Sequence, residues 1–423
     1  MLFPALLAIV IIAFAIVARW NIKHAIILLL ALTPTYLVRF SIGPVPMTLL
    51  ECFVLVVIGT FVIQNPLRLP RPWSSYGQSP HKWGRERRGL VLFGVVICVL
   101  SVMIAPDTLS ALGILKAYIV EPILLGMILA NTFDRDDYRR ALNALIASGA
   151  VIGLLAILQV IFHIGIPDAW AIENRATSIF PYPNAVGLLL APLVSAGVVM
   201  VSETWSRYRT SPSPSLVRRG IAVTGALVLM LGGIVAAETE AALVAIPAAL
   251  FVVALMSTVS KKMKVMVAGV SILGAIVIGI AVPSIVNKIS LYDSSGLVRR
   301  TQWSETFRML ADRPFLGTGL NGYPAALAPY HDATFYEIFQ YPHNIFLNVW
   351  SELGIFGLSC LLALMVALAE KTWRHRDDPF SLACFVALLT MSIHGLVDVP
   401  FFKNDLAIVT MFFVVGVLVK KKK

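Results

Sequence analysis

The feature that most constrains this chain is a series of long apolar stretches separated by polar loops. About thirteen stretches of roughly 16 to 22 residues are each long enough to cross a hydrocarbon core of about 30 Å as a helix. Only 13% of the 423 residues are charged and 58% are hydrophobic, which excludes an ordinary soluble enzyme. Backbone polar groups in lipid must be satisfied within their own segment, and strand-like alternation is missing from these stretches. We therefore predict an all-α polytopic membrane protein of about 12 to 13 transmembrane helices.

The expected spans form one polytopic domain over residues 1–423. They fall at 1–18, 24–38, 45–64, 89–105, 111–131, 141–162, 184–202, 220–237, 241–258, 265–284, 346–368, 380–397 and 406–419. The largest connection, 285–345, is charge-balanced and rich in aromatic residues, unlike a disordered tail. We expect it to fold over one face of the bundle, with short helices at 299–311 and 322–329.

The net charge of +11 is explained by where the basic residues lie. Most of the 34 Lys and Arg fall in loops that the expected spans place on one side of the membrane, and by the positive-inside rule that side is the cytoplasm. This orientation puts the N-terminus and the 285–345 loop outside and the C-terminus inside. The basic excess is a topology signal, and we expect no nucleic-acid partner. The basic loops contain Arg19, Lys23, 65–88, 135–140, 207–219, 261–264, 371–376 and 420–423.

Several familiar patterns in the chain have simpler explanations than the chemistry they suggest. The first apolar stretch lacks a basic leader and an obvious cleavage site, so we expect a retained helix. The four cysteines fall within spans and predict neither a disulfide nor a zinc site. A GxGxxG match at 317–322 lies in the outside loop, where turn-forming glycines explain it better than a dinucleotide site. Asp134-Arg-Asp136 resembles a metal-binding DxD, but a solvated charge cluster is the better interpretation.

Four segments expected to face outside place polar side chains at the membrane boundary, where such groups are costly unless used or paired. They are Arg175 to Tyr182-Pro183-Asn184; Glu238-Thr239-Glu240; Arg299-Arg300-Thr-Gln-Trp303 followed by Pro314-Phe-Leu-Gly317-Thr-Gly319; and His343-Asn344 followed by Glu352-Leu-Gly354-Ile-Phe-Gly357. Although far apart in sequence, they are expected to meet in one extracytoplasmic site.

With these segments in this order, the chain resembles the O-antigen ligase and O-antigen polymerase superfamily of bacterial membrane glycosyltransferases. The shared features are a PN motif opening a middle span, RxxxW and PxxGxG in a large outside loop, and HN followed by ExGxxG where that loop ends. They cover roughly residues 165 to 410. The resemblance implies a GT-C-like fold and transfer of a glycan from an undecaprenyl-diphosphate carrier at the outer face of the cytoplasmic (inner) membrane.

The resemblance also implies partners and residue roles. The partners are an undecaprenyl-diphosphate-linked oligosaccharide or polysaccharide, a glycan or lipid acceptor, and membrane lipids; no cofactor and no metal are expected. Arg299 matches the loop arginine thought to hold the diphosphate, and His343 matches the loop-end histidine implicated in catalysis. Where the family often has an S-R-G-like motif, this chain has Thr239-Glu240-Ala241. The reversed charge weakens an assignment to the lipid A-core ligases in particular.

Arginines are suited to the donor because cleavage of a sugar–diphosphate bond leaves negative charge on the diphosphate. Guanidinium groups stabilise such oxygens bidentately without a metal. Arg175, Arg299 and Arg300 are the outside candidates. We favour Arg299 over Arg300 because of its four-residue spacing to Trp303, whereas pairing with Glu173 is an alternative role for Arg175.

A histidine is suited to the acceptor because a sugar hydroxyl is a poor nucleophile and needs a base that titrates near neutrality. His343 is the best-placed histidine, and structural hydrogen bonding is its alternative role. Glu240 is a second candidate base or a group that orients the acceptor. His394 and Asp398 lie four apart on one face of the twelfth span, so they can pair near the site or serve only as a structural pair.

Further substrate contacts are expected from an amide and from aromatic rings. Asn184 opens the seventh span within the PN motif. Tyr182, Trp303 and Tyr323 are candidates to stack on sugar faces, although aromatic residues are also common at membrane interfaces.

The primary hypothesis is therefore an inverting, lipid-linked glycan transferase, with ligase and polymerase left open. The rival hypothesis is a secondary transporter or lipid-linked sugar flippase that uses the intramembrane charges Glu51, Lys116 and Glu121. The missing internal repeat and the large folded outside loop disfavour this rival.

Overall fold

The structure is a computed structural model that describes residues 2–43, 45–65, 83–256, 265, 269 and 291–419. Nearly all of the tenth expected span, 265–284, lies outside the described residues. So do most of the 65–88 and 261–264 basic loops and the C-terminal lysines.

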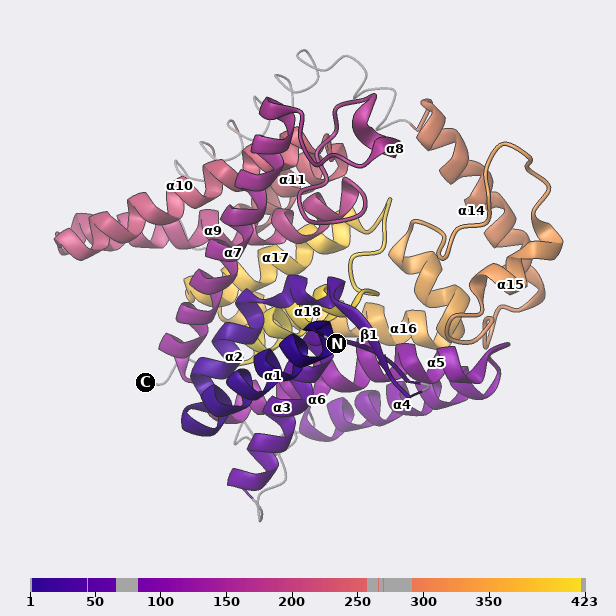
Figure 1. The fold of residues 1–423 in the computed structure, drawn as a ribbon, viewed down its shortest axis with the longest axis horizontal. Helices are drawn as coiled ribbons and strands as arrows, with labels where there is room; N and C mark the ends of the chain where they lie inside the picture. Colours follow the sequence, from indigo (N-terminus) through magenta and orange to yellow (C-terminus); the bar gives the residue numbers. More distant parts are fainter. Residues whose placement is uncertain are drawn as a thin grey trace.

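The described residues form a bundle of apolar helices (Figure 1). Its helices are α1 (Leu2–Trp20), α2 (Ile22–Ala31), α3 (Leu49–Gln64), α4 (Trp83–Met103), α5 (Thr108–Ile114), α6 (Glu121–Thr132), α7 (Arg135–Phe162), α9 (Asn184–Thr210), α10 (Pro214–Ala236), α11 (Glu240–Met256), α16 (Ile345–Arg374), α17 (Pro379–His394) and α18 (Asn404–Leu418). Six described segments are long and apolar enough to cross a membrane, and six shorter apolar helices accompany them. The prediction of an all-α polytopic membrane protein is confirmed.

Helices α9 and α17 occupy the centre of the bundle. Both are buried over most of their length, and α9 packs against α7, α10, α11 and α17. Next to them, the Tyr138 ring contacts the rings of Phe380 and Phe412 at centroid distances of 6.1 and 5.9 Å. By contrast, much of α1 faces outward, as expected of a helix in contact with lipid.

The expected span at 24–38 is too long. Helix α2 ends at Ala31, a 3-10 turn follows at Thr33–Leu37, and a two-stranded hairpin is formed by β1 (Arg39–Ile42) and β2 (Val45–Thr48). Pro34 lies at the start of the 3-10 turn, where its missing N–H cannot continue an α-helix. Gly43 has a φ of +61°, which suits the hairpin turn. The expected span at 45–64 consequently begins as a strand, and its helix starts only at Leu49.

Glu51, Lys116 and Glu121, the intramembrane charges of the transport hypothesis, lie close together, although Lys116 and Glu121 are five residues apart in the chain. Residues five apart do not share a face of a regular α-helix, but Leu115–Val120 is a π-helical turn, in which they do. Lys116 Nζ lies 2.7 Å from Glu51 Oε1 and 3.8 Å from Glu121 Oε1. The charges thus pair with one another, which accounts for their presence without a transport path.

A cap, defined as residues 291–344, covers one side of the bundle next to α16 (Figure 1). It contains α14 (Ser294–Asp312), α15 (Tyr323–Leu327) and a 3-10 turn at Ala328–Tyr330, where the two short helices are expected. Helix α14 begins earlier than predicted because the Asp293 side chain accepts a hydrogen bond from Gly296 N–H and caps it. Met309, Tyr323 and Leu327 form the core of the cap.

The glycine motifs join the cap to α16. Gly354 has a φ of +70° and interrupts α16, which leaves the Ser351 carbonyl to accept a hydrogen bond from Thr318 N–H at 2.6 Å. Gly317 also has a positive φ, +71°, and a Cβ there would lie 2.3 Å from the Ser351 carbonyl oxygen. A Cβ on Gly354 would lie 2.0 Å from the Phe315 carbonyl oxygen. The prediction that the GxGxxG match consists of turn glycines is confirmed.

Ion pairs connect the loops predicted to be cytoplasmic. Lys23 Nζ lies 2.5 Å from Asp137 Oδ2, and Arg139 Nη2 lies 2.7 Å from Glu203 Oε1. Arg135 pairs with Asp378. We call this region the basic end: Lys23, 134–140, 203–207 and 371–378. Its DxD-like sequence is structural, because the Asp134 side chain accepts hydrogen bonds from the Asp136 and Asp137 backbone N–H groups at the start of α7.

Candidate functional site

The candidate site is built around one short connection, residues 395–403 between α17 and α18, which we call the hub loop. Three distant segments meet it. Arg299 Nε of α14 donates a hydrogen bond to the Val397 carbonyl oxygen at 3.2 Å. His343 Nδ1 lies 3.8 Å from Asp398 Oδ1, and Lys403 Nζ lies 2.6 Å from the Tyr182 hydroxyl oxygen. The arginine and the histidine singled out by sequence thus contact consecutive residues of one loop.

The hub loop lies at the end of the bundle opposite the basic end. Helix α17 runs from Asp378, which pairs with Arg135 at the basic end, to His394 beside the hub loop. Helix α9 runs from Asn184, next to Tyr182, to Arg207, which pairs with Glu203. From Asn184 to Arg207, at about 1.5 Å per residue, α9 separates the two ends by roughly 35 Å.

His343 is positioned by the segment that starts α16. Its φ of +48° is uncommon for a residue other than glycine and turns the chain sharply before the helix. Asn344 caps α16 by accepting hydrogen bonds from Phe346 and Leu347 N–H, and its Nδ2 donates to the Leu396 carbonyl oxygen at 3.0 Å. The HN motif therefore starts the helix, and its Asn344 ties the segment to the hub loop.

Asp398 is buried in the hub loop, where its Oδ1 lies 3.8 Å from His343 Nδ1, and it also interacts electrostatically with His394 at the end of α17. Burial alone would raise the pKa of the Asp398 carboxyl group. The nearby His343 ring and the positive charge of Lys403 outweigh burial and hold the pKa well below its ordinary value. Asp398 Oδ1 also accepts a hydrogen bond from Val399 N–H at 2.7 Å. The side chain is therefore a fixed carboxylate beside the imidazole ring.

Lys403 is a site residue that the sequence analysis missed. Its Nζ lies 4.9 Å from the centre of the Tyr182 ring and 5.6 Å from the centre of the Tyr341 ring. Burial opposes the charge on Lys403, but Asp398 and the two phenols outweigh it and raise the Lys403 pKa above its ordinary value. The sequence signal for Lys403 is a lysine in a short loop between two apolar spans. No motif includes this residue.

Arg175, Asn184 and Glu240 lie in a neighbouring group. Arg175 Nε donates to the Ala237 carbonyl oxygen at 3.4 Å, and its Nη2 lies 3.5 Å from Asn184 Oδ1. The expected pairing with Glu173 is present at 3.4 Å. Glu240 is half-buried at the start of α11. Tyr182, two residues before Asn184, links this group to Lys403. The Arg175 contacts support the end of α10, a structural role.

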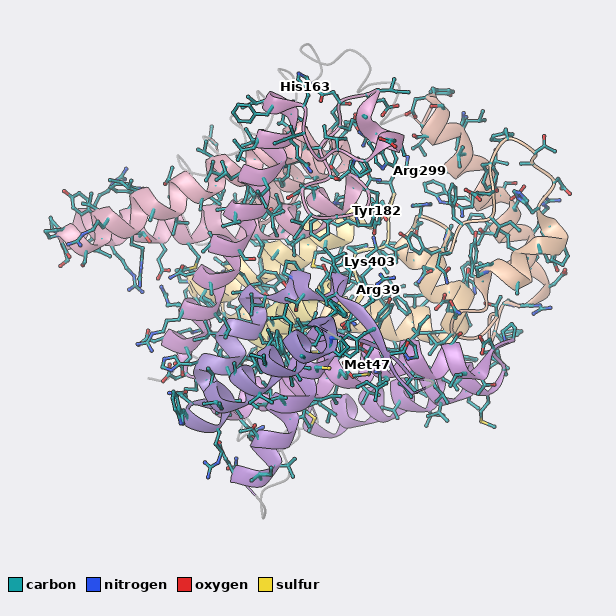
Figure 2. All side chains as sticks on the ribbon, in the orientation of Figure 1. Arg39, Met47, His163, Tyr182, Arg299 and Lys403 are labelled. Carbon is teal, nitrogen blue, oxygen red and sulfur yellow. The ribbon has the colours of Figure 1, made fainter. Side chains whose placement is uncertain are left out.

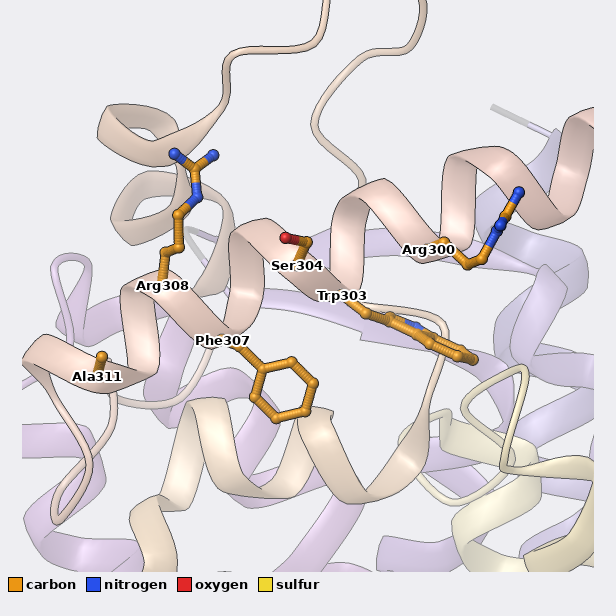
Figure 3. A pocket seen from close by; sticks show the side chains of 6 residues that line it. All are labelled: Arg300, Trp303, Ser304, Phe307, Arg308 and Ala311. Atoms are coloured by element: carbon orange, nitrogen blue, oxygen red, sulfur yellow. The ribbon is translucent and has the colours of Figure 1, made fainter.

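The remaining candidates divide between the outer face and the core of the cap. Arg300 and Trp303 line a shallow hollow of about 590 Å³ along one face of α14, shown in Figure 3. Trp303 Nε1 also donates to the Pro342 carbonyl oxygen at 2.8 Å, directly before His343. Tyr323, by contrast, is completely buried and hydrogen-bonded to Thr306 at 2.8 Å. The expectation that Tyr323 stacks on a sugar is therefore wrong for this structure, because its ring packs in the cap core.

Figure 2 shows how the labelled polar residues are distributed. Arg299, Tyr182 and Lys403 follow one another between the cap and the bundle, with Arg39 of β1 beyond Lys403. His163, at the end of α7, is not part of this series.

These observations define a class: a helical, multi-pass membrane protein with a polar site where a cap meets one end of the bundle. Residues 225–362, about a third of the chain, match the family model described as O-Antigen ligase, and this match supports the resemblance to the O-antigen ligase superfamily. The matched segment includes α14 and His343 and ends within α16. No curated protein gives a significant match to the chain. The family indicates a role in glycan transfer at a membrane, with a lipid-linked glycan and an acceptor as partners in general.

Proposed function

We propose that this protein transfers a glycan from an undecaprenyl-diphosphate donor to an acceptor hydroxyl, with inversion at the anomeric carbon and without a metal. The reaction would take place at the extracytoplasmic end of the bundle in the inner membrane of a bacterium. The observation that carries the proposal is the convergence of Arg299, His343 and Tyr182 on the hub loop, which itself supplies Lys403 and Asp398.

The donor side of the reaction is assigned to the two cations. Breaking the bond between the anomeric carbon and the diphosphate oxygen leaves the electron pair on the diphosphate. A guanidinium and an ammonium group fixed in advance stabilise that developing charge. The hydrogen-bond partners of Arg299 and Lys403 are neutral, a carbonyl oxygen and a phenol, although the Asp398 carboxylate also acts on the Lys403 charge. Neither cation is paired directly with an acid within 4.0 Å among the described residues, so both can contact an anion.

The acceptor side is assigned to His343 and Asp398. The acceptor oxygen attacks the anomeric carbon from the face opposite the diphosphate, and its proton passes to the His343 ring. The nearby Asp398 carboxylate fixes the ring and stabilises the imidazolium that forms. Asp398 acts through the histidine and is a positioning residue.

Product analysis tests this proposal directly. The purified full-length protein is given a defined polyprenyl-diphosphate oligosaccharide in excess chelator, and the products are separated by size. A ladder of repeat units on the carrier identifies a polymerase, whereas a single transfer to a different acceptor identifies a ligase. Loss of all transfer on chelation, restored by a divalent ion, would contradict the metal-independent mechanism.

The variant His343→Ala tests the assignment of the base. We expect the variant to keep the melting temperature of the wild type and to lose at least about 100-fold in transfer rate, the typical contribution of a general base. A variant that folds and transfers at the wild-type rate would remove His343 from the mechanism.

A further inference from the structure

Beside the candidate site, residues 335–343 carry a continuous series of aromatic rings. The ring centroids are 5.4 Å apart from Phe335 to Tyr336, 5.8 Å from Tyr336 to Phe339 and 5.1 Å from Phe339 to His343. The Tyr341 ring lies 5.0 Å from the other side of His343. The series begins at the cap surface, where Phe335 is 55% exposed, and ends at the candidate base. We call Phe335, Tyr336 and Phe339 the aromatic track.

The outer end of the track is held by a single buried carboxylate on α14. Glu305 Oε1 accepts a hydrogen bond from Asp332 N–H at 3.2 Å, and Glu305 Oε2 accepts one from the Tyr336 hydroxyl. His331 Nδ1 lies 3.0 Å from the same Oε2, while its Nε2 lies 3.1 Å from the Tyr336 carbonyl oxygen. His331 therefore bridges the Glu305 carboxylate and the backbone of Tyr336. The Tyr336 ring is therefore fixed in place.

The inner end of the track is held by the same face of α14, one turn earlier. Gln302 Nε2 donates to the Tyr341 carbonyl oxygen at 3.0 Å, and Trp303 Nε1 donates to the Pro342 carbonyl oxygen. An irregular segment that is fixed at both ends and still exposes aromatic rings is preorganised to bind a ligand. Cap stability alone does not account for the outward-facing Phe335 ring.

The polar groups around the track indicate what it binds. Asp332, Glu337 and Gln340 are exposed in the same segment, and Gln340 Nε2 donates to Asn321 Oδ1 at 2.5 Å. Rings alternating with amide and carboxylate groups match a sugar chain, which presents apolar C–H faces and hydroxyl groups together. A surface that binds lipid tails would lack these hydrogen-bonding groups.

We propose that the aromatic track binds the sugar units of the lipid-linked glycan that lie beyond the reacting sugar. This inference rests on the proposed function for the substrate class, because the track ends at His343. The rings stack on successive pyranose faces, and Gln340 and Glu337 contact the hydroxyl groups. The diphosphate lies on the other side of the histidine, with Arg299 and Lys403. Long glycans therefore bind through the track, whereas the diphosphate binds through the cations.

The test uses a glycan that has neither lipid nor diphosphate, so that only the track is measured. Oligosaccharides are released by mild acid from the lipid-linked pool of the source cells, sized to several repeat units and tritium-labelled by reduction. Binding to the full-length protein is measured by equilibrium dialysis. We expect Phe335→Ala to weaken binding about tenfold, the typical value of one aromatic stacking contact, and Phe335→Trp to restore it.

The matched control is Phe315→Ala, which removes an equally exposed aromatic ring, 64% accessible, that stacks on Phe356 of α16 away from the track. This variant is expected to bind the oligosaccharide as the wild type does. The inference is overturned if wild-type protein binds none of the oligosaccharide at millimolar concentration, or if the Phe335 and Phe315 variants weaken binding equally.

The two proposals fail separately. Arg299→Ala is expected to keep binding of the free oligosaccharide while losing transfer from the lipid-linked donor. If Arg299→Ala and His343→Ala both transfer normally, the proposed function fails whatever the dialysis shows. If those variants are inactive and Phe335→Ala binds like wild type, the track alone is wrong.

Discussion

The two ends of the bundle use basic side chains in different ways. At the basic end, Lys23, Arg135 and Arg139 each pair with a carboxylate. We call the opposite end, which carries the hub loop, the site end. There Arg299 donates a hydrogen bond to a backbone carbonyl and Lys403 donates one to a phenol. Among the described residues, neither cation forms an ion pair within 4.0 Å. A cation paired with an acid is already neutralised and mainly connects helices. A cation whose hydrogen-bond partners are neutral keeps its charge for an anionic ligand, so this difference supports the proposal that the diphosphate binds at the site end.

The strongest test of this contrast replaces one arginine at each end. Arg299→Ala is expected to lower the transfer rate by about 100- to 1000-fold, the usual cost of removing a group that stabilises developing charge. Arg139→Ala at the basic end is expected to change the rate less than about twofold while lowering the free energy of unfolding by about 2 kcal/mol. Transfer assays and thermal unfolding of both variants check this. Equal losses of activity would show that the two ends do not differ in function.

Asp398→Asn tests how the carboxylate beside the histidine acts. We expect the rate at neutral pH to fall roughly 100-fold, since the amide neither fixes the ring nor stabilises the imidazolium. Asp398 itself has a lowered pKa, so its charge is present throughout the neutral range. A wild-type transfer rate in the folded variant would exclude coupling to His343.

Lys403→Met sharpens the comparison within the site end. The substitution keeps an unbranched chain between Tyr182 and Tyr341 but removes the charge. We expect the KM for the polyprenyl-diphosphate donor to rise about tenfold, which corresponds to about 1.4 kcal/mol, with a smaller change in kcat. Donor titrations measure both constants. A lower kcat with an unchanged KM would instead show that Lys403 stabilises the transition state and does not contribute to donor binding.

The smallest effect is expected in the cap. Burial opposes ionisation of Glu305, but hydrogen bonds with His331, Tyr336 and the Asp332 N–H outweigh it and lower the Glu305 pKa below its ordinary 4.5. A lowered pKa stabilises the cap above pH about 4.5, and that stability is lost as the pH falls through the lower folded value. The protection factors of the amides in 331–340, which correct for the intrinsic pH dependence of exchange, should therefore fall in acid. Glu305→Gln should show fast exchange already at pH 7, and a protected segment in that variant would contradict the role of Glu305.

The sequence predicted the helices well because a membrane span is specified locally by its own apolar residues. Twelve of the thirteen expected spans have an apolar helix among the described residues. The errors in the predicted helices arose where the chain departs from a regular α-helix. Pro34 stops α2 early and a hairpin follows, and a π-helical turn brings Lys116 and Glu121 onto one face.

The site was only partly predictable. Arg299 and His343 lie in motifs and could be named as candidates from the sequence. Lys403 was missed, and the proximity of Asp398 to His343 was not predicted, because their partners come from segments more than 50 residues away. Tyr323 was a candidate for stacking on a sugar, yet it is buried in the cap core, where its hydroxyl hydrogen-bonds to Thr306. Motifs therefore point to the residues that define the site, while the groups that position them depend on tertiary contacts.

A structure of the full-length protein with a bound polyprenyl-diphosphate oligosaccharide tests the central claim most directly. The account predicts diphosphate oxygens within hydrogen-bond distance of Arg299 and Lys403, the anomeric carbon facing His343, and sugar units running toward Phe335. A diphosphate held at the basic end, or in the hollow beside Arg300 and Phe307, would contradict it.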